Sequence, residues 1–149
     1  MYQHQMIDGS KINLPAGKVV CIGRNYAAHA KELNNPIPTT PILFMKPSTA
    51  LVALGEPFDI PQGQGSVHHE VELAILIGET LTITNANAAK SAIAGIGLAL
   101  DLTLRDVQSK LKEKGHPWEI AKAFDGSCPL SAFVKTDAFS DLTDISLEL

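Results

Sequence analysis

Residues 67–77 read VHHEVELAILI and are the part of the sequence that most clearly indicates a strand. Polar and apolar side chains alternate through the first half, which places Glu70 and Glu72 on the same face. The second half is apolar on both faces, as in the interior of a sheet. His68 and His69 are adjacent on this strand and face opposite ways, so a metal ion shared by the two is not expected.

Shorter apolar runs on either side predict further strands, and three segments have helical composition. Because the strands outnumber the helices and the helices are short, the pattern favours a β-rich α+β fold over a doubly wound βαβ fold. The GxG at 95–97 lacks the third glycine of a dinucleotide fingerprint, and the GxxxxGK[ST] pattern of phosphate-binding loops is absent. Strands are predicted over 19–23, 42–45, 80–84, 96–102 and 132–134, with another beginning at 145, and helices over 27–33, 87–94 and 104–114.

The composition is that of one globular domain spanning 1–149. Hydrophobic residues make up 45% of the 149 and charged residues 19%, enough to build a core. The net charge of −4, without a run of like charge, argues against nucleic acid or an anionic membrane as a partner. Two cysteines without a CxxC pattern form neither a disulfide framework nor a zinc site. With no secretory signal and no apolar stretch of ~20 residues, the sequence predicts a cytoplasmic protein.

Three carboxylates are candidates for a metal site. Glu70 and Glu72 leave one face of the strand and repel each other unless a cation or a proton lies between them. Asp101 interrupts an otherwise apolar strand, where a lone buried carboxylate is costly. A hard divalent cation, Mg²⁺ or Mn²⁺, would stabilise all three. The alternatives are a solvent-facing strand for the two glutamates and a helix N-cap for Asp101.

His29 and Glu32 form a second candidate pair. At a spacing of three residues on a helical turn they share a face and can meet. A glutamate beside a histidine fixes its tautomer and raises its basicity, as in a general base. The alternative is a surface turn with an incidental contact.

Five segments together resemble the fumarylacetoacetate hydrolase family, in its acylpyruvase and oxaloacetate decarboxylase branch. The similarity extends from Lys18 to about Val134. The segments are GRNYAAHAKEL (23–33), FMKPSTAL (44–51), HHEVELAILIG (68–78), DLTLRDVQ (101–108) and GHPWEIAKAFDGSCPLS (115–131).

The resemblance implies a mixed β-sheet roll with short helices, and proteins of this family are commonly homodimers. It also implies a role for each matching residue. It implies Mg²⁺ or Mn²⁺ as cofactor and a 2-oxo acid as the small-molecule substrate. The metal ligands implied are Glu70, Glu72 and Asp101; the catalytic residues are His29, Glu32 and Lys122; and the substrate-binding residues are Arg24, Lys46, Ser48, Arg105 and Gln108.

The function implied is cleavage of the C3–C4 bond of 2-oxo acids through a metal-stabilised pyruvate enolate, either as acylpyruvate hydrolysis or as oxaloacetate decarboxylation. Two alternatives stay open. One is an isomerase or decarboxylase of homoprotocatechuate-pathway 2-oxo diacids, and the other is a non-catalytic fragment that binds metal or dimerises. The later G-T-P-x-G-V type segment of the family is absent, so we expect a C-terminally truncated chain with an incomplete sheet roll; the alternative is a protein that is natively short.

Overall fold

The computed structural model describes residues 2–26, 38–139, 141 and 145–146. Strands dominate the described part and the helices are short, which confirms the predicted β-rich α+β class. The strands are β1 (Val19–Gly23), β2 (Ile42–Lys46), β3 (Leu51–Ala53), β4 (Val67–Ile77), β5 (Ile93–Leu104) and β6 (Cys128–Leu130). The helices are α2 (Ala86–Ser91), α3 (Arg105–Glu113) and α4 (Glu119–Lys122), with 3-10 turns η1 (Ser48–Ala50) and η2 (Thr136–Ala138).

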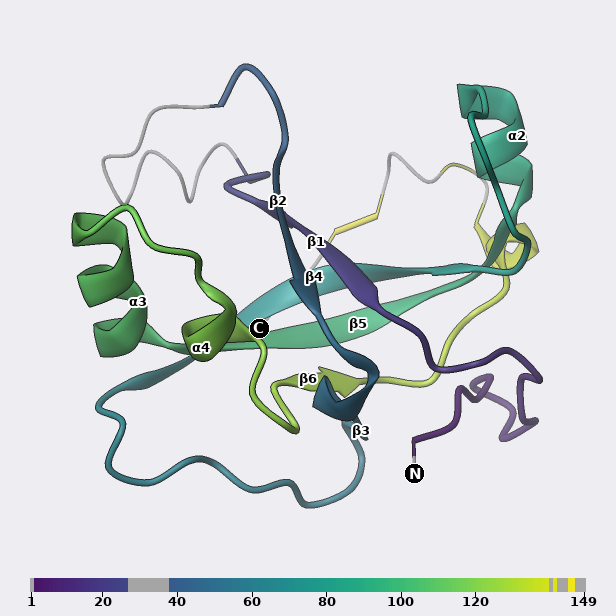
Figure 1. Ribbon diagram of the computed structural model, residues 1–149. Coiled ribbons are helices and arrows are strands. Elements are labelled where there is room, and N and C mark those ends of the chain that lie inside the picture. The colour runs from purple at the N-terminus through teal and green to yellow at the C-terminus, as the bar shows by residue number, and fades with distance from the viewer. Residues whose placement is uncertain (1, 27–37, 140, 142–144, 147–149) are drawn as a thin grey trace.

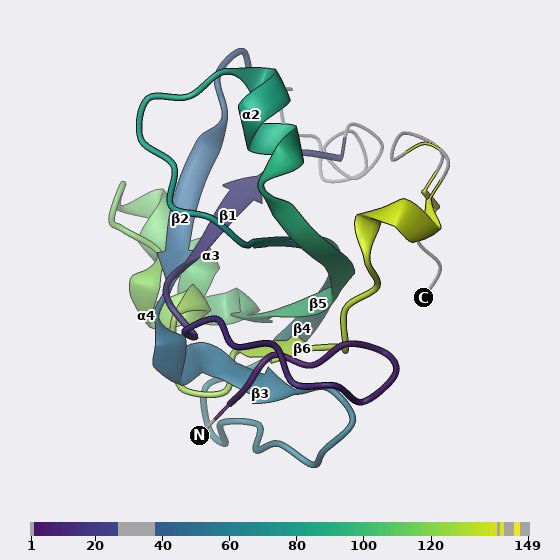
Figure 2. The ribbon, with the colours of Figure 1, turned by 90° about the vertical axis from the view of Figure 1, so that its right-hand side faces the viewer.

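The strands form two sheets that lie over one another. Four strands make a mixed sheet in the order β3-β6-β5-β4, in which only β3 and β6 run parallel. The strands β1 and β2 pair as a separate antiparallel hairpin. This hairpin crosses over the long β4–β5 ribbon, with α3 and α4 gathered at one end (Figure 1). The view from the side shows the two layers (Figure 2).

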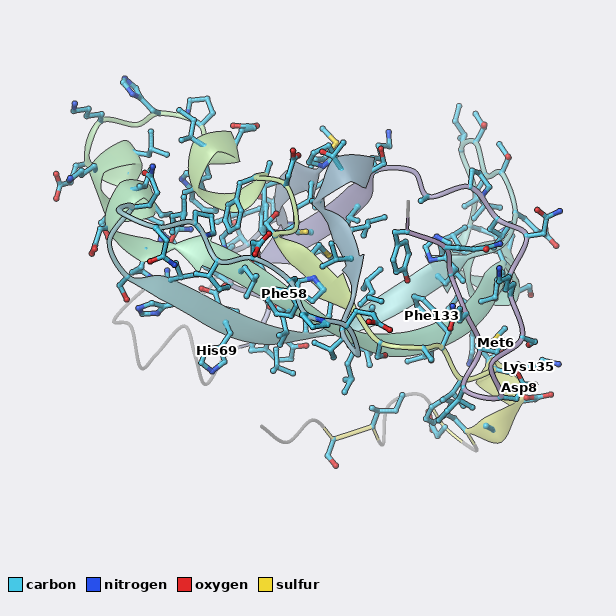
Figure 3. All side chains as sticks on the ribbon, turned by 90° about the horizontal axis from the view of Figure 1, so that it is seen from below. Met6, Asp8, Phe58, His69, Phe133 and Lys135 are labelled. Atoms are coloured by element: carbon cyan, nitrogen blue, oxygen red, sulfur yellow. The ribbon has the colours of Figure 1, made fainter. Side chains whose placement is uncertain are left out.

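The register between β4 and β5 determines which side chains meet. Glu70 lies directly opposite Asp101, and Glu72 lies opposite Ala99. Residues directly opposite on an antiparallel pair share a face, so all three carboxylates leave the same side of the ribbon. His69 projects from the other face, as its pairing with Leu102 requires (Figure 3). The predicted strand over 67–77 is confirmed residue for residue.

The core lies on the same face and begins next to the carboxylates, since its member Ala99 is opposite Glu72. Leu76, Ala99, Leu130 and Phe133 are buried there together. The N-terminal segment is held against this cluster by a bridge from Met6 to Phe133, with Asp8 and Lys135 at the same end of the molecule (Figure 3). No helix of the described residues has both the length and the apolar character needed to cross a membrane.

Several sequence predictions need correction. The segment 80–84 contains no strand, and Ile83 is fully exposed with a positive φ of 46°. The helix predicted over 87–94 ends at Ser91, because Ile93 already belongs to β5. Of the strand predicted over 132–134, only Phe133 and Val134 take part in isolated bridges. The helix over 27–33 lies outside the described residues, and so does most of the segment beginning at 145.

Candidate functional site

An open cavity lies between the hairpin and the β4–β5 ribbon. Its floor is the carboxylate face of the ribbon, and its walls come from the end of β1, from β2 and from α3 and α4. Charged side chains of both signs line it, together with Phe44 and Trp118. The charged and amide residues lining it are Arg24, Asn25, Glu70, Glu72, Asp101, Arg105, Gln108, Lys112 and Lys122.

Lys122 lies at the centre of the charge cluster. Its ammonium is 2.9 Å from Glu70 Oε2 and 2.5 Å from Asp101 Oδ2, and its side chain is only 3% exposed. The side chain reaches this point because Lys122 ends the short helix α4, which packs against both β2 and β5. Charge-assisted hydrogen bonds of this kind are the strong ones in proteins. Lys122 therefore fixes the two facing carboxylates in one arrangement.

Arg105 joins the strand pair to the first turn of α3. Its guanidinium forms an ion pair with Glu70, donates from Nη1 to Gln108 Oε1 at 2.6 Å and donates from Nε to His68 Nδ1 at 3.3 Å. Burial opposes ionisation of Glu70, but the charges of Lys122 and Arg105 outweigh it and lower the pKa of this carboxyl. Glu70 is therefore ionised and held from both sides.

Lys46 lies beneath the cavity and does not line it. Its side chain is completely buried, and its ammonium is 2.9 Å from Asp101 Oδ1. It donates to the carbonyl oxygens of Leu102 at 3.3 Å and Ser127 at 3.1 Å, and also to the carbonyl of Lys122. Every donor of this ammonium is thus directed to the protein. Lys46 supports Asp101 and the backbone around Lys122 from behind.

Glu72 differs from the other two carboxylates because no described cationic side chain forms an ion pair with it. Burial and the negative charges of Asp101 and Glu70 raise its pKa to about 7, against the effect of a hydrogen bond from Tyr26. Tyr26 follows β1, and its hydroxyl also accepts a bond of 3.5 Å from the Leu73 amide. Tyr26 therefore ties the end of the hairpin to the strand that carries Glu72.

The carboxylates fit a hard divalent cation in chemical kind. Three of them line one cavity, and Glu72 has no cationic partner in the described chain, whereas Asp101 Oδ1 is already 2.9 Å from the Lys46 ammonium. They are not assembled as a ready site, since no three His, Cys, Asp or Glu side chains among the described residues are grouped to hold a metal. The ammonium of Lys122 occupies the place between Glu70 and Asp101.

The structure brings together most of the predicted site residues. Glu70, Glu72 and Asp101 share the cavity with Arg105 and the others implied on α3 and α4, Gln108 and Lys122. Arg24 also lines the cavity, with a left-handed backbone (φ 57°) that non-glycine residues seldom adopt. Ser48 is exposed at the start of η1 and does not line the cavity, and neither does Lys46. His29 and Glu32 lie outside the described residues.

The cavity residues that sequence reasoning missed include Tyr26, Phe44, Lys112 and Trp118. For Lys112 the signal was present, because it follows Arg105 and Gln108 at helical spacings of seven and four residues. For the aromatic residues no spacing rule applies. Phe44 and Trp118 meet only through the fold, with ring centroids 6.0 Å apart.

Comparison with known proteins identifies relatives across most of the chain. Residues 18–149 match the family model described as fumarylacetoacetate (FAA) hydrolase C-terminal. An oxaloacetate tautomerase of Escherichia coli is 56% identical over 94% of this chain, and a mitochondrial oxaloacetate decarboxylase of Dictyostelium discoideum is 44% identical over 87%. The chain spans 64% of the length of the first and 60% of the second.

Solved structures show the same architecture. A fumarylacetoacetate hydrolase family protein from Yersinia pestis superposes with a TM-score of 0.91 at 51% identity, covering 94% of this chain and 64% of that one. A fumarylpyruvate hydrolase from Pseudomonas aeruginosa, solved in complex with Mn²⁺ and pyruvate, superposes with a TM-score of 0.81 at 36% identity. The superposition covers 91% of this chain and 60% of the Pseudomonas chain.

Proposed function

Because the chain belongs to the fumarylacetoacetate hydrolase family, we propose that it contributes the site of a divalent-metal-dependent enzyme that cleaves the C3–C4 bond of 2-oxo acids. The observation that carries the proposal is a single cavity in which three carboxylates face Arg105 and Lys122. Such a site can hold a cation and an anionic substrate together. Relatives named as an oxaloacetate decarboxylase and a fumarylpyruvate hydrolase support this substrate class.

Glu70, Glu72 and Asp101 are the residues we propose as holders of Mg²⁺ or Mn²⁺. When bound, the cation would supply Lewis-acid stabilisation of negative charge on the substrate. The Mn²⁺ in the Pseudomonas structure supports a divalent ion of this type. Since Lys122 lies between two of these carboxylates, we expect its ammonium to turn toward the cavity when they are otherwise engaged.

The chain's own cations would bind and orient the substrate. Arg105 presents a planar guanidinium at the start of α3, held in place by Gln108 and His68, and such a group suits a carboxylate. Lys122 approaches from α4, so the two cations contact the two oxygens of the Glu70 carboxylate. Phe44 lies 5.1 Å from the Lys122 ammonium and covers it from the hairpin side, which limits water there. These residues would hold the developing enolate oxygen and the carboxylate ends.

His29, oriented by Glu32, is proposed as the base that takes a proton from the attacking water in acylpyruvate hydrolysis. Decarboxylation of oxaloacetate needs no added nucleophile, because CO₂ departs directly. His29→Ala should therefore reduce acetylpyruvate hydrolysis by ~10²–10⁴-fold and affect oxaloacetate decarboxylation much less. An equal loss in both assays would contradict this division of roles.

Keto–enol tautomerisation of oxaloacetate is the second candidate, favoured by the name of the Escherichia coli relative. Tautomerisation moves a proton at C3 and leaves the C3–C4 bond intact, whereas decarboxylation releases CO₂. The two reactions are separated by following enol absorbance and released CO₂ in the same sample. Enol formation without CO₂ would support the tautomerase and exclude C3–C4 cleavage of this substrate.

The test of the site combines turnover with metal binding. Purified protein is assayed with oxaloacetate and acetylpyruvate in Mg²⁺, in Mn²⁺ and in EDTA, and Mn²⁺ binding is measured separately by calorimetry. Glu72→Gln should abolish metal-dependent turnover and weaken Mn²⁺ binding. Glu79→Gln makes the same change at an exposed residue outside the cavity and should leave both unchanged. Mn²⁺ binding that is identical in the two variants would refute the metal assignment.

A homodimer is also part of the proposal. The outward face of the hairpin presents a patch of exposed apolar side chains, Val20, Ile22, Leu43 and Met45. Apolar patches on a protein surface commonly mark contact sites. Light scattering on the purified chain would show the dimer as a doubled mass, and a mass of one chain at all concentrations would exclude it.

A further inference from the structure

The positive charges around the cavity form two groups. The inner group, Lys46, Arg105 and Lys122, is paired with Glu70 and Asp101. The outer group consists of Arg24 and Lys112, which line the cavity without an ion pair to any described carboxylate. An anion that reaches from the floor to the rim would therefore meet unpaired positive charge at its outer end.

Lys112 is held at this rim by the aromatic wall. Its ammonium lies 5.2 Å from the centroid of the Trp118 indole, a distance typical of a cation–π contact. Trp118 in turn packs against Phe44, and Gly23 of β1 approaches the indole closely. The contact gives an otherwise flexible lysine a defined position over the cavity.

The surroundings of Lys112 favour an incoming anion. Partial burial is the main cause that lowers the pKa of its ammonium, and repulsion by the positive charges of Arg105, Arg24 and Lys122 adds to it. A bound carboxylate would relieve this repulsion. Lys112 also continues the helical face that carries Arg105 and Gln108, so all three side chains line the same cavity.

We propose that Lys112 is a specificity-determining residue that binds the second carboxylate of a 2-oxo diacid. The inference rests on the proposed function, in which the inner cations bind the 2-oxo acid end. A diacid such as oxaloacetate places a further negative charge beyond C3. An acylpyruvate with an alkyl end places a neutral group there and gains nothing from the rim lysine. Lys112 thus selects diacids over neutral-ended acyl substrates.

The experiment compares Lys112→Met with Lys110→Met in the protein with Mg²⁺. Both variants remove one lysine charge from α3 and keep an unbranched side chain, but Lys110 does not line the cavity. Binding of 2-oxoglutarate, a stable diacid, and of pyruvate, a monoacid, is measured by calorimetry. Lys112→Met should weaken 2-oxoglutarate about fivefold, the size expected for one exposed charge pair, and leave pyruvate unchanged. Lys110→Met should change neither.

Turnover gives an independent readout. In Lys112→Met the ratio of kcat/KM for oxaloacetate to that for acetylpyruvate should fall about fivefold, while Lys110→Met keeps the wild-type ratio. Equal effects of Lys112→Met on both ligands, no effect on either, or no binding of either ligand to the wild-type protein would overturn the inference. Wild-type protein that binds 2-oxoglutarate through Lys112 but turns over no substrate would refute the proposed function alone.

Discussion

Replacement of Lys46 by methionine should destabilise the fold more than any other loss of a single lysine in the described chain. Methionine keeps most of the length of the buried stem but removes the ammonium 2.9 Å from Asp101 Oδ1. It also leaves the buried carbonyls of Leu102 and Ser127 without this donor. Removing one partner of a buried ion pair typically costs ~3–5 kcal/mol. Against a usual domain stability of ~5–15 kcal/mol, this variant should be close to unfolding.

The measurement is urea unfolding followed by circular dichroism and by the fluorescence of Trp118, the only tryptophan. The midpoint should fall at an unchanged slope, because a change in slope would mean a different unfolded state. Lys18→Met, at an exposed residue before β1, is the matched control and should lie within ~0.5 kcal/mol of wild type.

A double-mutant cycle with Asp101→Asn separates the ion pair from the carbonyl contacts. Asp101 keeps Lys122 at 2.5 Å after Lys46 is lost, so the pair with Lys46 should account for only part of the effect. We expect a coupling energy of ~1–2 kcal/mol between the two substitutions. A cost below ~1 kcal/mol for Lys46→Met, together with a coupling energy near zero, would show that Lys46 does not support Asp101.

Three further predictions concern residues outside the charge cluster. Gly65→Ala should destabilise the fold by ~1 kcal/mol more than Gly63→Ala in urea unfolding. Both glycines have a positive φ, but only at Gly65 would a Cβ lie 2.1 Å from Asp106 Oδ2. Equal costs of the two substitutions would contradict this prediction. Burial lowers the pKa of His4, so its neutral form stabilises the fold above pH ~6.5 and stability is lost as the pH falls below that value; His4→Phe should lack this loss in pH-dependent melting. Burial raises the pKa of Cys128 to about 11, so at pH 8 its alkylation should be at least ~100-fold slower in the native than in the urea-unfolded protein, and comparable rates would refute its burial.

The sequence was sufficient where a local period determines the structure. Alternation over 67–77 predicted both the strand and the common face of Glu70 and Glu72, because side chains on a strand alternate whatever lies around it. The apolar stripe over 104–114 likewise predicted α3 to within one residue at each end. These features depend on neighbours within the chain and need no knowledge of the partner strand.

The features that failed depend on pairing between distant segments. The strand predicted over 80–84 does not form, and no described strand pairs with this segment. The strand β6 was missed because Pro129 lacks a backbone donor and argues against a strand, yet it is buried beside β3 in a parallel pair. The short helix α4, which positions Lys122, has only four residues and leaves no periodic signal.

In the candidate site, too, some features could be predicted from the sequence and others depend on the fold. Resemblance to a family could name Glu70, Asp101 and Lys122, but only the register of β4 and β5 shows that the two carboxylates face each other directly. The spacing of residues also could not show that the Lys46 side chain points away from the cavity and into the protein. Its direction depends on how β2 packs against β5 and α4. Roles assigned along a motif therefore need the fold before they become contacts.

The arrangement of charges explains how one fold tolerates three carboxylates in so small a volume. Lys46 and Lys122 neutralise Asp101 from two sides, and Arg105 with Lys122 neutralises Glu70, so two of the three are stable without any added ion. Lys46 is buried behind Asp101, whereas Lys122 lies between the carboxylates on the cavity side. Were Glu70, Glu72 and Asp101 to hold a divalent cation, as we propose, the Lys122 ammonium would leave its place between Glu70 and Asp101 and be left facing the cavity, where an anionic substrate is expected to bind. Metal binding and the freeing of a substrate-binding cation would then be one event, since both depend on the same two carboxylates.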